Sequence, residues 1–206
     1  NHYRLGGLKI TLDGSPQGRT AWRTVPYLIP PDGQKQGYSG YPAIPDTTQV
    51  ESYLDEAYAK GWPVKVHANG DAAIDQLFVA LRPVVAKHGV KPGQTILIHG
   101  QFIRPDQVKE LKSLGIFPSM FPMHTFYWGD WYKQIVDPET AAGISPMRSI
   151  LSTGLHATSH TDGYYRVFGV DPAFGRANIH TWRQVLGTDP DGAIEKLLET
   201  FRKAKQ

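Results

Sequence analysis

The amino-acid sequence predicts an α/β fold built on a parallel sheet. Two observations carry this prediction. Short apolar runs with a period of two alternate along the chain with longer runs of helical spacing, and several of the short runs end in a histidine or an aspartate. Strands that alternate with helices form parallel sheets, and functional residues gather where such strands end. A chain of 206 residues is long enough to bury a substantial core, and we expect one domain.

The first part of the chain consists of an expected strand, a long connection and a helix. In residues 7–13 the apolar side chains face one way and Lys9 the other, so Lys9 points inward in a β/α barrel or, alternatively, reaches out to solvent. Residues 21–48 hold five prolines and have no periodicity, which is typical of a functional lid or of disorder. Residues 49–60 have the spacing of a helix, and Gly61 ends it.

The central stretch is Pro63 to Asp75, PVKVHANGDAAID. It reads as a strand ending at His67, followed by a helix that Asp71 caps. This helix runs towards residue 88, and Pro83 is expected to kink or break it. Residues 95–99, TILIH, predict a second apolar strand that closes on His99.

The remaining elements are predicted from shorter signals. Pro105 fits the first turn of a helix, and residues 116–122 fit a strand despite two prolines. An aromatic loop is expected at 124–132, and Ser145 is expected to cap a further helix. A last strand is expected at 155–162, and a final helix at 191–205. This strand places four side chains on one face: His156, Thr158, His160 and Asp162.

Composition excludes several classes of protein. The chain is 40% hydrophobic and 20% charged, as in ordinary globular proteins, and no apolar run approaches the roughly 20 residues of a membrane span. The 22 basic and 19 acidic residues are spread along the chain, so we expect no nucleic-acid partner. Without cysteine, any metal must be held by histidine, carboxylate or modified lysine. Because no signal region is present, we expect a cytoplasmic location.

Three expected strands end in residues that bind metals: His67, His99 and Asp162. Parallel strands would bring His67 and His99 side by side at one edge of the sheet. A divalent cation held there lowers the pKa of a bound water and polarises a carbonyl group. The spacing therefore predicts a metal hydrolase, although a lone strand-end histidine is more often structural. For His156 and His160 we favour a structural role, with hydrogen bonds to Thr or Ser neighbours.

Five motifs then resemble one family in their order and spacing, over about residues 5–165. They are LKITLDGSPQGRT (8–20), HANGDAAID (67–75), LIHGQ (97–101), PSMFPMHTFYWGDW (118–131) and HTDG (160–163). This series resembles the YtcJ-like branch, or amidohydrolase family 3, of the amidohydrolase superfamily. The segment HTFYWGDW is most similar to N-substituted formamide deformylases.

The resemblance implies a partial TIM-type (β/α)8 barrel that comprises about strands 4–8. It implies a single domain over 1–206, in which the tail 173–206 is unassigned, and one or two divalent metals, usually zinc. By this resemblance His67, His99 and Asp162 are metal ligands, and Lys9 falls where many members have a bridging carboxylated lysine.

The resemblance also implies the reaction. A metal-activated water attacks the carbonyl of an amide-type C–N bond in a small molecule, and Asp162 is the catalytic proton shuttle. Four residues are expected to face the substrate: Arg19, Gln101, His124 and Trp128. Two of them have alternatives, since Arg19 would also serve to pin its own loop and Trp128 to pack that segment on the barrel rim.

One feature of the family is missing from the sequence. Members take their first two metal ligands from a His-x-His on strand one, and the chain contains no such motif. We therefore expect the second half of a barrel. The alternative to an active hydrolase is a catalytically incomplete fragment, which associates through exposed strand edges, including with copies of itself.

Overall fold

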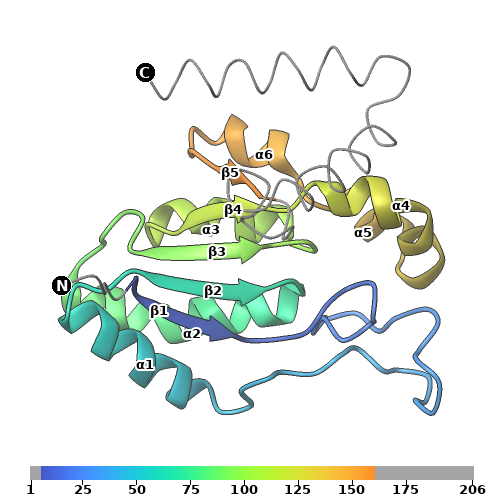
Figure 1. Cartoon of the computed structure of the whole chain (residues 1–206), viewed down its shortest axis with the longest axis horizontal. Coiled ribbons are helices and arrows are strands. Elements are labelled where there is room, and N and C mark those ends of the chain that lie inside the picture. The colour runs from blue at the N-terminus through green and yellow to red at the C-terminus, as the bar shows by residue number, and fades with distance from the viewer. Residues whose placement is uncertain (1–5, 161–206) are drawn as a thin grey trace, which may run out of the picture. The chain divides into compact units, whose positions relative to one another are not determined.

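Five parallel strands form the centre of the structure, a computed structural model that describes residues 6–160 (Figure 1). Each strand pairs with the next one along the chain, in the order β1-β2-β3-β4-β5. This arrangement confirms the predicted α/β class and the parallel sheet. The strands are β1 (Leu8–Thr11), β2 (Val64–Ala68), β3 (Thr95–His99), β4 (Phe117–Met120) and β5 (Thr158–Ser159).

Helices connect the strands as the alternating pattern predicts. Helices α1, α2 and α3 lie on one face of the sheet (Figure 1). The long connection after β1, together with α4 and α5, lies beyond the carboxyl ends of the strands (Figure 1). The helices are α1 (Thr47–Ala59), α2 (Asp71–His88), α3 (Pro105–Ser113), α4 (Met123–Ile135), α5 (Pro138–Ala142) and α6 (Met147–Ser152).

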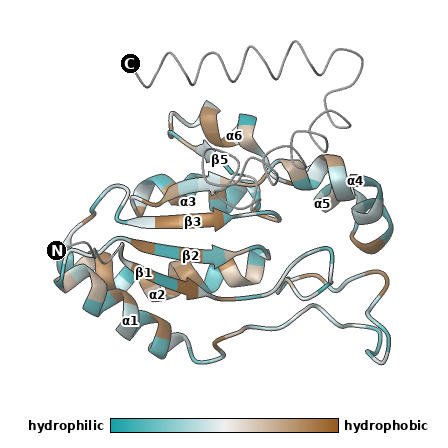
Figure 2. Cartoon of the chain, viewed as in Figure 1, coloured by the Kyte–Doolittle hydropathy of each residue, from teal (hydrophilic) through white to brown (hydrophobic). Residues whose placement is uncertain are grey.

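The core lies between the sheet and these helices. Val64, Val66 and Leu97 are fully buried on the helix-covered face, where Leu54 of α1 and Leu77 of α2 pack against the sheet. Figure 2 shows hydrophobic segments along β1 and β3. Burying one such side chain contributes roughly 1.5–3 kcal/mol. The alternation of apolar and polar side chains along each strand therefore determines which face packs against the helices.

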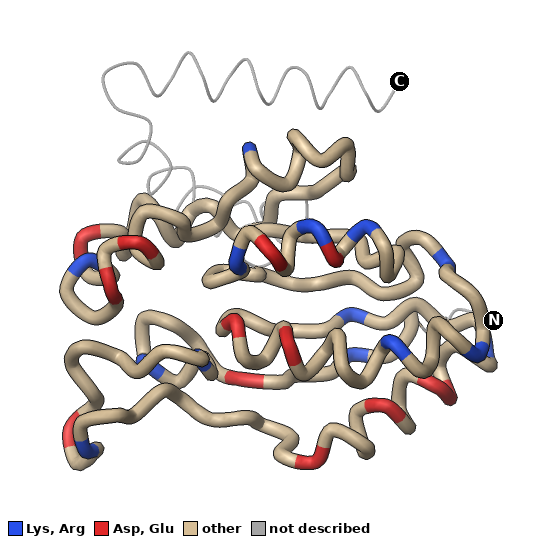
Figure 3. The backbone as a smooth tube through the Cα atoms, turned by 180° about the vertical axis from the view of Figure 1, so that it is seen from behind, with Lys and Arg blue, Asp and Glu red and all other residues tan. Residues whose placement is uncertain are grey.

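The opposite face of the sheet is polar at its β1 and β2 end. Lys9 and Thr11 of β1 and Lys65 of β2 are exposed there, and His67 is half-buried. Charges of both signs are dispersed over the helices, and Figure 3 shows basic and acidic residues alternating along α3. Among the helices of residues 6–160, none has both the length and the hydropathy of a membrane span.

Three local predictions are wrong. Residues 124–132 form part of α4 rather than a loop, because their aromatic side chains pack together and override weak helix propensity at Gly129. The N-cap of α2 is Gly70, one residue before Asp71. The backbone of Trp22 passes so close to this position that a Cβ atom would clash with it, so residue 70 must be glycine. Ser145 does not cap α6; Pro146 occupies that position.

Two further differences concern element lengths. Helix α2 continues past Pro83 to His88. Pro83 has no N–H group to donate to the carbonyl of Val79, but both residues are exposed, so water can bond this carbonyl instead. The last strand is shorter than expected, with β5 limited to Thr158–Ser159. Asp162, the tail 173–206 and the expected helix at 191–205 lie outside the described residues.

Candidate metal centre

His67 and His99 meet at the carboxyl ends of β2 and β3. Their ring centroids are 4.7 Å apart in an edge-on arrangement. Strand register alone would separate them, because His99 lies opposite Ala68 and His67 lies opposite Ile98. A φ of +79° at His99 takes this residue out of strand geometry and redirects its side chain. A non-glycine residue in this region stores about 1–3 kcal/mol of strain, which is typical of functional sites.

His67 is held in one tautomer by a backbone carbonyl. Its Nε2 lies 3.0 Å from the oxygen of Gly14, to which Asn69 Nδ2 also donates at 2.9 Å. A carbonyl oxygen only accepts hydrogen bonds, so Nε2 carries the proton and the lone pair is on Nδ1. This leaves Nδ1 as the nitrogen through which His67 would bind a metal.

Asp13, two residues after the end of β1, is the buried residue that organises this edge. Its carboxylate accepts hydrogen bonds from the backbone N–H groups of Trp22 at 3.0 Å, Asn69 at 3.0 Å and Gly70 at 2.7 Å. Oδ1 also lies 3.5 Å from His67 Nε2. Burial raises the pKa of Asp13 to about 7, against the opposing effect of the three N–H donors.

Sequence analysis did not predict this role, because it singled out Lys9 and no other residue of the expected strand 7–13. A usable signal was present, since a carboxylate at the carboxyl end of a strand lies at the same edge as His67. The carboxylate ties together the end of β1, the end of β2 and the start of α2.

His99 is buried and neutral. Burial is the largest cause that holds its pKa far below the ordinary 6.5, followed by the positive charges that His67, His160, His124 and Lys9 can carry. Its Nδ1 lies 3.0 Å from Nε2 of His160, whose Nδ1 lies 3.0 Å from Ser119 Oγ. His160 therefore has the expected hydrogen bond to a serine and also contacts His99, whereas His156 is exposed.

His124 lies at the start of α4, beside the aromatic rings that connect it to this cluster. Its ring centroid is 4.4 Å from that of Phe121 and 4.9 Å from that of Trp128. Phe121 in turn stacks on His160 at 5.4 Å. Burial lowers the pKa of His124 to about 4, so its imidazole is neutral at physiological pH.

Two other residues expected to face the substrate have internal contacts. Gln101 is fully buried, and its Oε1 accepts a hydrogen bond from Ser145 Oγ at 2.9 Å. Arg19 donates to the carbonyl oxygens of Ile29 and Pro30 at 3.3 and 3.0 Å, and its guanidinium lies over the Trp131 ring. These contacts are those of the loop-pinning alternative for Arg19, and its contact with substrate stays a prediction.

The donor set fits part of a metal centre. His67 and His99 supply two imidazoles, and burial keeps that of His99 in the neutral form that binds metals. Within residues 6–160, no group of three or more histidine or carboxylate side chains is arranged to hold an ion. Asp162, the third predicted ligand, lies outside the described residues, and the role of Lys9 as a bridging ligand stays a prediction.

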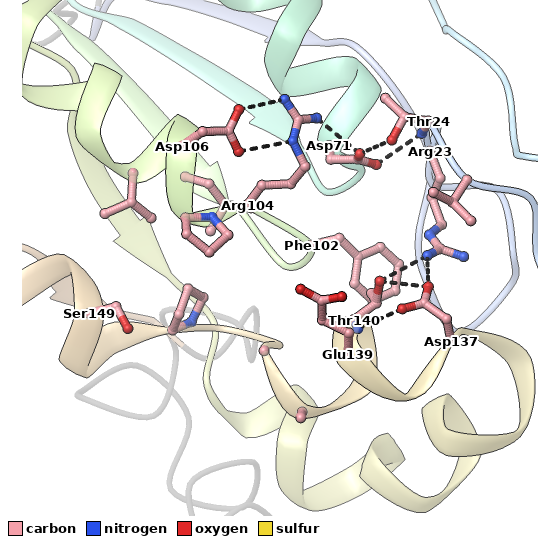
Figure 4. A pocket seen from close by; sticks show the side chains of 17 residues that line it. Arg23, Thr24, Asp71, Phe102, Arg104, Asp106, Asp137, Glu139, Thr140 and Ser149 are labelled. Atoms are coloured by element: carbon pink, nitrogen blue, oxygen red, sulfur yellow. Dashed lines mark hydrogen bonds and ion pairs between the residues drawn. The ribbon is translucent and has the colours of Figure 1, made fainter.

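A separate cavity of about 580 Å³ lies between the starts of α2 and α3 and helices α5 and α6 (Figure 4). None of the residues predicted for the site lines it. Its charged groups largely pair with one another: Arg104 donates to Asp71 and Asp106, and Arg23 donates to Asp137 (Figure 4). These pairs join the start of α3 to α2 and the connection after β1 to α5, which indicates a structural role.

Comparison with known proteins identifies the family. A model of the amidohydrolase family matches residues 1–206, the entire chain. The chain belongs to the amidohydrolase family. The expected family is thereby confirmed.

Two curated proteins are similar to the chain at low identity. It is 24% identical over 175 residues to YtcJ of Bacillus subtilis (strain 168), which is named as an amidohydrolase; the match covers 84% of this chain and 31% of that protein. It is 25% identical over 150 residues to protein LONG AFTER FAR-RED 3 of Arabidopsis thaliana, covering 73% and 25%. The chain thus spans less than a third of the length of these two relatives.

Two crystal structures share the fold. An uncharacterized metal-dependent hydrolase from Pyrococcus furiosus matches with a TM-score of 0.64 and 26% identity, over 85% of this chain and 33% of that one. An uncharacterized metal-dependent hydrolase from Pyrococcus horikoshii OT3 matches with a TM-score of 0.63 and 23% identity, over 89% and 35%. The second likeness concerns the fold alone.

Proposed function

We propose that this chain supplies strand-end residues of a metal-dependent hydrolase that cleaves amide-type C–N bonds in small molecules. The observation that carries the proposal is the meeting of two imidazoles, His67 and His99, at the carboxyl ends of neighbouring parallel strands. Membership of the amidohydrolase family supports it, as does the likeness to a hydrolase described as metal-dependent.

We further propose that β1–β5 correspond to consecutive strands of a (β/α)8 barrel. Sequential parallel pairing supports this, as do helices on one face and exposed Lys9 and Lys65 on the other. In a closed barrel that polar face would line the interior, below the strand ends where barrel enzymes carry their active sites.

The residues of the chain have distinct parts in this proposal. His67 and His99 would hold the metal, and Asp162 would complete the set and pass a proton to the departing amine. Asp13 and Gly14 fix the strand ends and the tautomer of His67. A bound divalent cation, zinc being the best match to nitrogen and oxygen ligands, would polarise the carbonyl and acidify a water.

Metal content tests the proposal. The purified chain is loaded with zinc, dialysed and submitted to elemental analysis, and about one or more zinc per chain is expected. His67→Ala and His99→Ala should each lose this zinc, because each removes one imidazole from the pair. His156→Ala is the matched control, since it removes an exposed imidazole and should retain the metal.

The alternative, a catalytically incomplete fragment, predicts a different result in the same sample. It is favoured by the uncovered edges of β1 and β5 among the described strands and by the absence of His-x-His from the sequence. A chain that holds no zinc and has an oligomeric mass by light scattering would support it. Equal zinc in wild type and His67→Ala would contradict the proposed centre.

A further inference from the structure

Two buried side chains of α4 form a hydrogen bond that the sequence analysis did not anticipate. The phenol oxygen of Tyr132 bonds Nδ1 of His124, and the two rings are nearly parallel, with an interplanar angle of 12°. Tyr132 is 0% exposed and His124 is 3% exposed. Helix side chains lean towards the amino terminus, which lets Tyr132 reach back two turns to His124.

Counting protons fixes the direction of this bond. The phenol carries one proton, and within residues 6–160 His124 Nδ1 is its only hydrogen-bond partner. If the imidazole donated, the phenol proton would be buried without an acceptor, which is unfavourable. If the phenol donates, both groups are satisfied. Burial also raises the pKa of Tyr132 and lowers that of His124, so the phenol keeps its proton and the imidazole stays neutral.

Donation by Tyr132 places the proton of His124 on Nε2. This nitrogen has no hydrogen-bond partner among the described residues, whereas the imidazole plane is held by the Phe121 and Trp128 rings. Phe121 also stacks on His160, which contacts His99. A rigid N–H donor therefore lies one aromatic ring, that of Phe121, away from His160 and His99.

We propose that Tyr132 is a positioning residue that holds His124 as the tautomer whose Nε2–H donates a hydrogen bond to the carbonyl oxygen of the substrate. The inference rests on the proposed hydrolase function. Negative charge develops on that oxygen when water adds to the carbon, so a fixed donor stabilises the transition state more than the ground state. Tyr132 acts only through His124 and touches no substrate.

The tautomer is tested first, by ¹⁵N NMR of protein labelled at histidine, with the His124 signals assigned from the His124→Gln variant. In the wild type we expect Nε2 to be protonated and Nδ1 unprotonated at pH 7. Tyr132→Phe should move both shifts towards a mixture of tautomers, while Tyr53→Phe, a partly exposed control on α1, should leave them unchanged. A protonated Nδ1 in the wild type would overturn the proposal, whether or not Tyr132→Phe folds.

Kinetics then separates this inference from the proposed function. With p-nitroacetanilide as the probe, Tyr132→Phe should lower kcat about tenfold with little change in KM. It should have no further effect in a His124→Gln background, because the two residues act as a unit. An unchanged kcat in His124→Gln would refute the substrate role of His124. A lowered kcat there, with Tyr132→Phe equal to wild type, would refute the role of Tyr132 alone.

Discussion

The helix-covered face of the sheet and its carboxyl edge are built from the same strands but from opposite kinds of side chain. On the covered face, Val66 and Leu97 are buried among other apolar groups and need only fill space. At the edge, Asp13, His67 and His99 are polar, and their hydrogen bonds or backbone geometry depend on particular neighbours. Burial of apolar surface stabilises the fold in the first region. In the second region, specific hydrogen bonds orient the polar side chains that could take part in chemistry.

The largest stability effect should come from the covered face. Leu77→Ala removes a fully buried side chain of α2 and leaves a cavity, so we expect a loss of about 3 kcal/mol in the free energy of unfolding by urea denaturation. Val79→Ala, on the exposed side of the same helix, should change it by less than about 0.5 kcal/mol. Equal losses for the two variants would mean that the helix does not pack as described.

The two regions also differ in how far the sequence predicts them. On the covered face, period two and helical spacing predicted the strands and the buried side chains directly, because each pattern is local. At the carboxyl edge, the prediction that His67 and His99 meet came from their positions at the ends of neighbouring parallel strands. The positive φ of His99 and the burial of Asp13 depend on the approach of distant loops, which no local pattern records.

Helix α4 is a second example of a feature that local sequence patterns did not predict. Its aromatic residues have weak helix propensity and suggested a loop. The helix is favoured instead by packing of His124, Trp128 and Tyr132 at successive four-residue steps. The hydrogen bond between His124 and Tyr132 depends on this helix. A prediction of a loop at 124–132 therefore missed both the helix and the hydrogen bond.

A smaller effect tests whether the pairing described for the edge extends into the long connection after β1. Arg23 is buried, and its guanidinium donates to Asp137 of the α5 N-cap at 2.8 Å. Asp137→Asn leaves that cation without its anionic partner, which should cost about 2 kcal/mol; this is less than for a fully buried pair, because Asp137 is one-third exposed. Urea denaturation measures the loss, and hydrogen exchange over residues 21–30 should accelerate.

Asp130→Asn is the control for that variant. Asp130 pairs with Lys133 on the surface of α4, and its side chain is 94% exposed. Its replacement should leave the urea midpoint nearly unchanged, because water screens this exposed pair. If Asp137→Asn behaved like this control, the buried arginine would not hold the connection after β1 on α5.

The smallest effect on stability is expected for the exposed carboxylate of Asp106, whose ion pair with Arg104 is removed when the pH is lowered. Asp106 lies at the start of α3, where hydrogen bonds from the Arg104 side chain hold its pKa below 3.8. A lowered folded-state pKa contributes stability that is present above 3.8 and is lost as pH falls through the folded value. Asp106→Asn should therefore be less stable than wild type by at most about 0.5 kcal/mol at pH 7.

Acidification sharpens this last test. The difference between wild type and Asp106→Asn in urea midpoint should shrink as pH falls below 3.8, because protonation of Asp106 removes the charge that the variant lacks. The Leu77→Ala difference has no such cause and should persist over the same range. A gap for Asp106→Asn that widened on acidification would show that the carboxylate is not stabilised by Arg104, and that surface pairing there differs from the pairing at the buried edge.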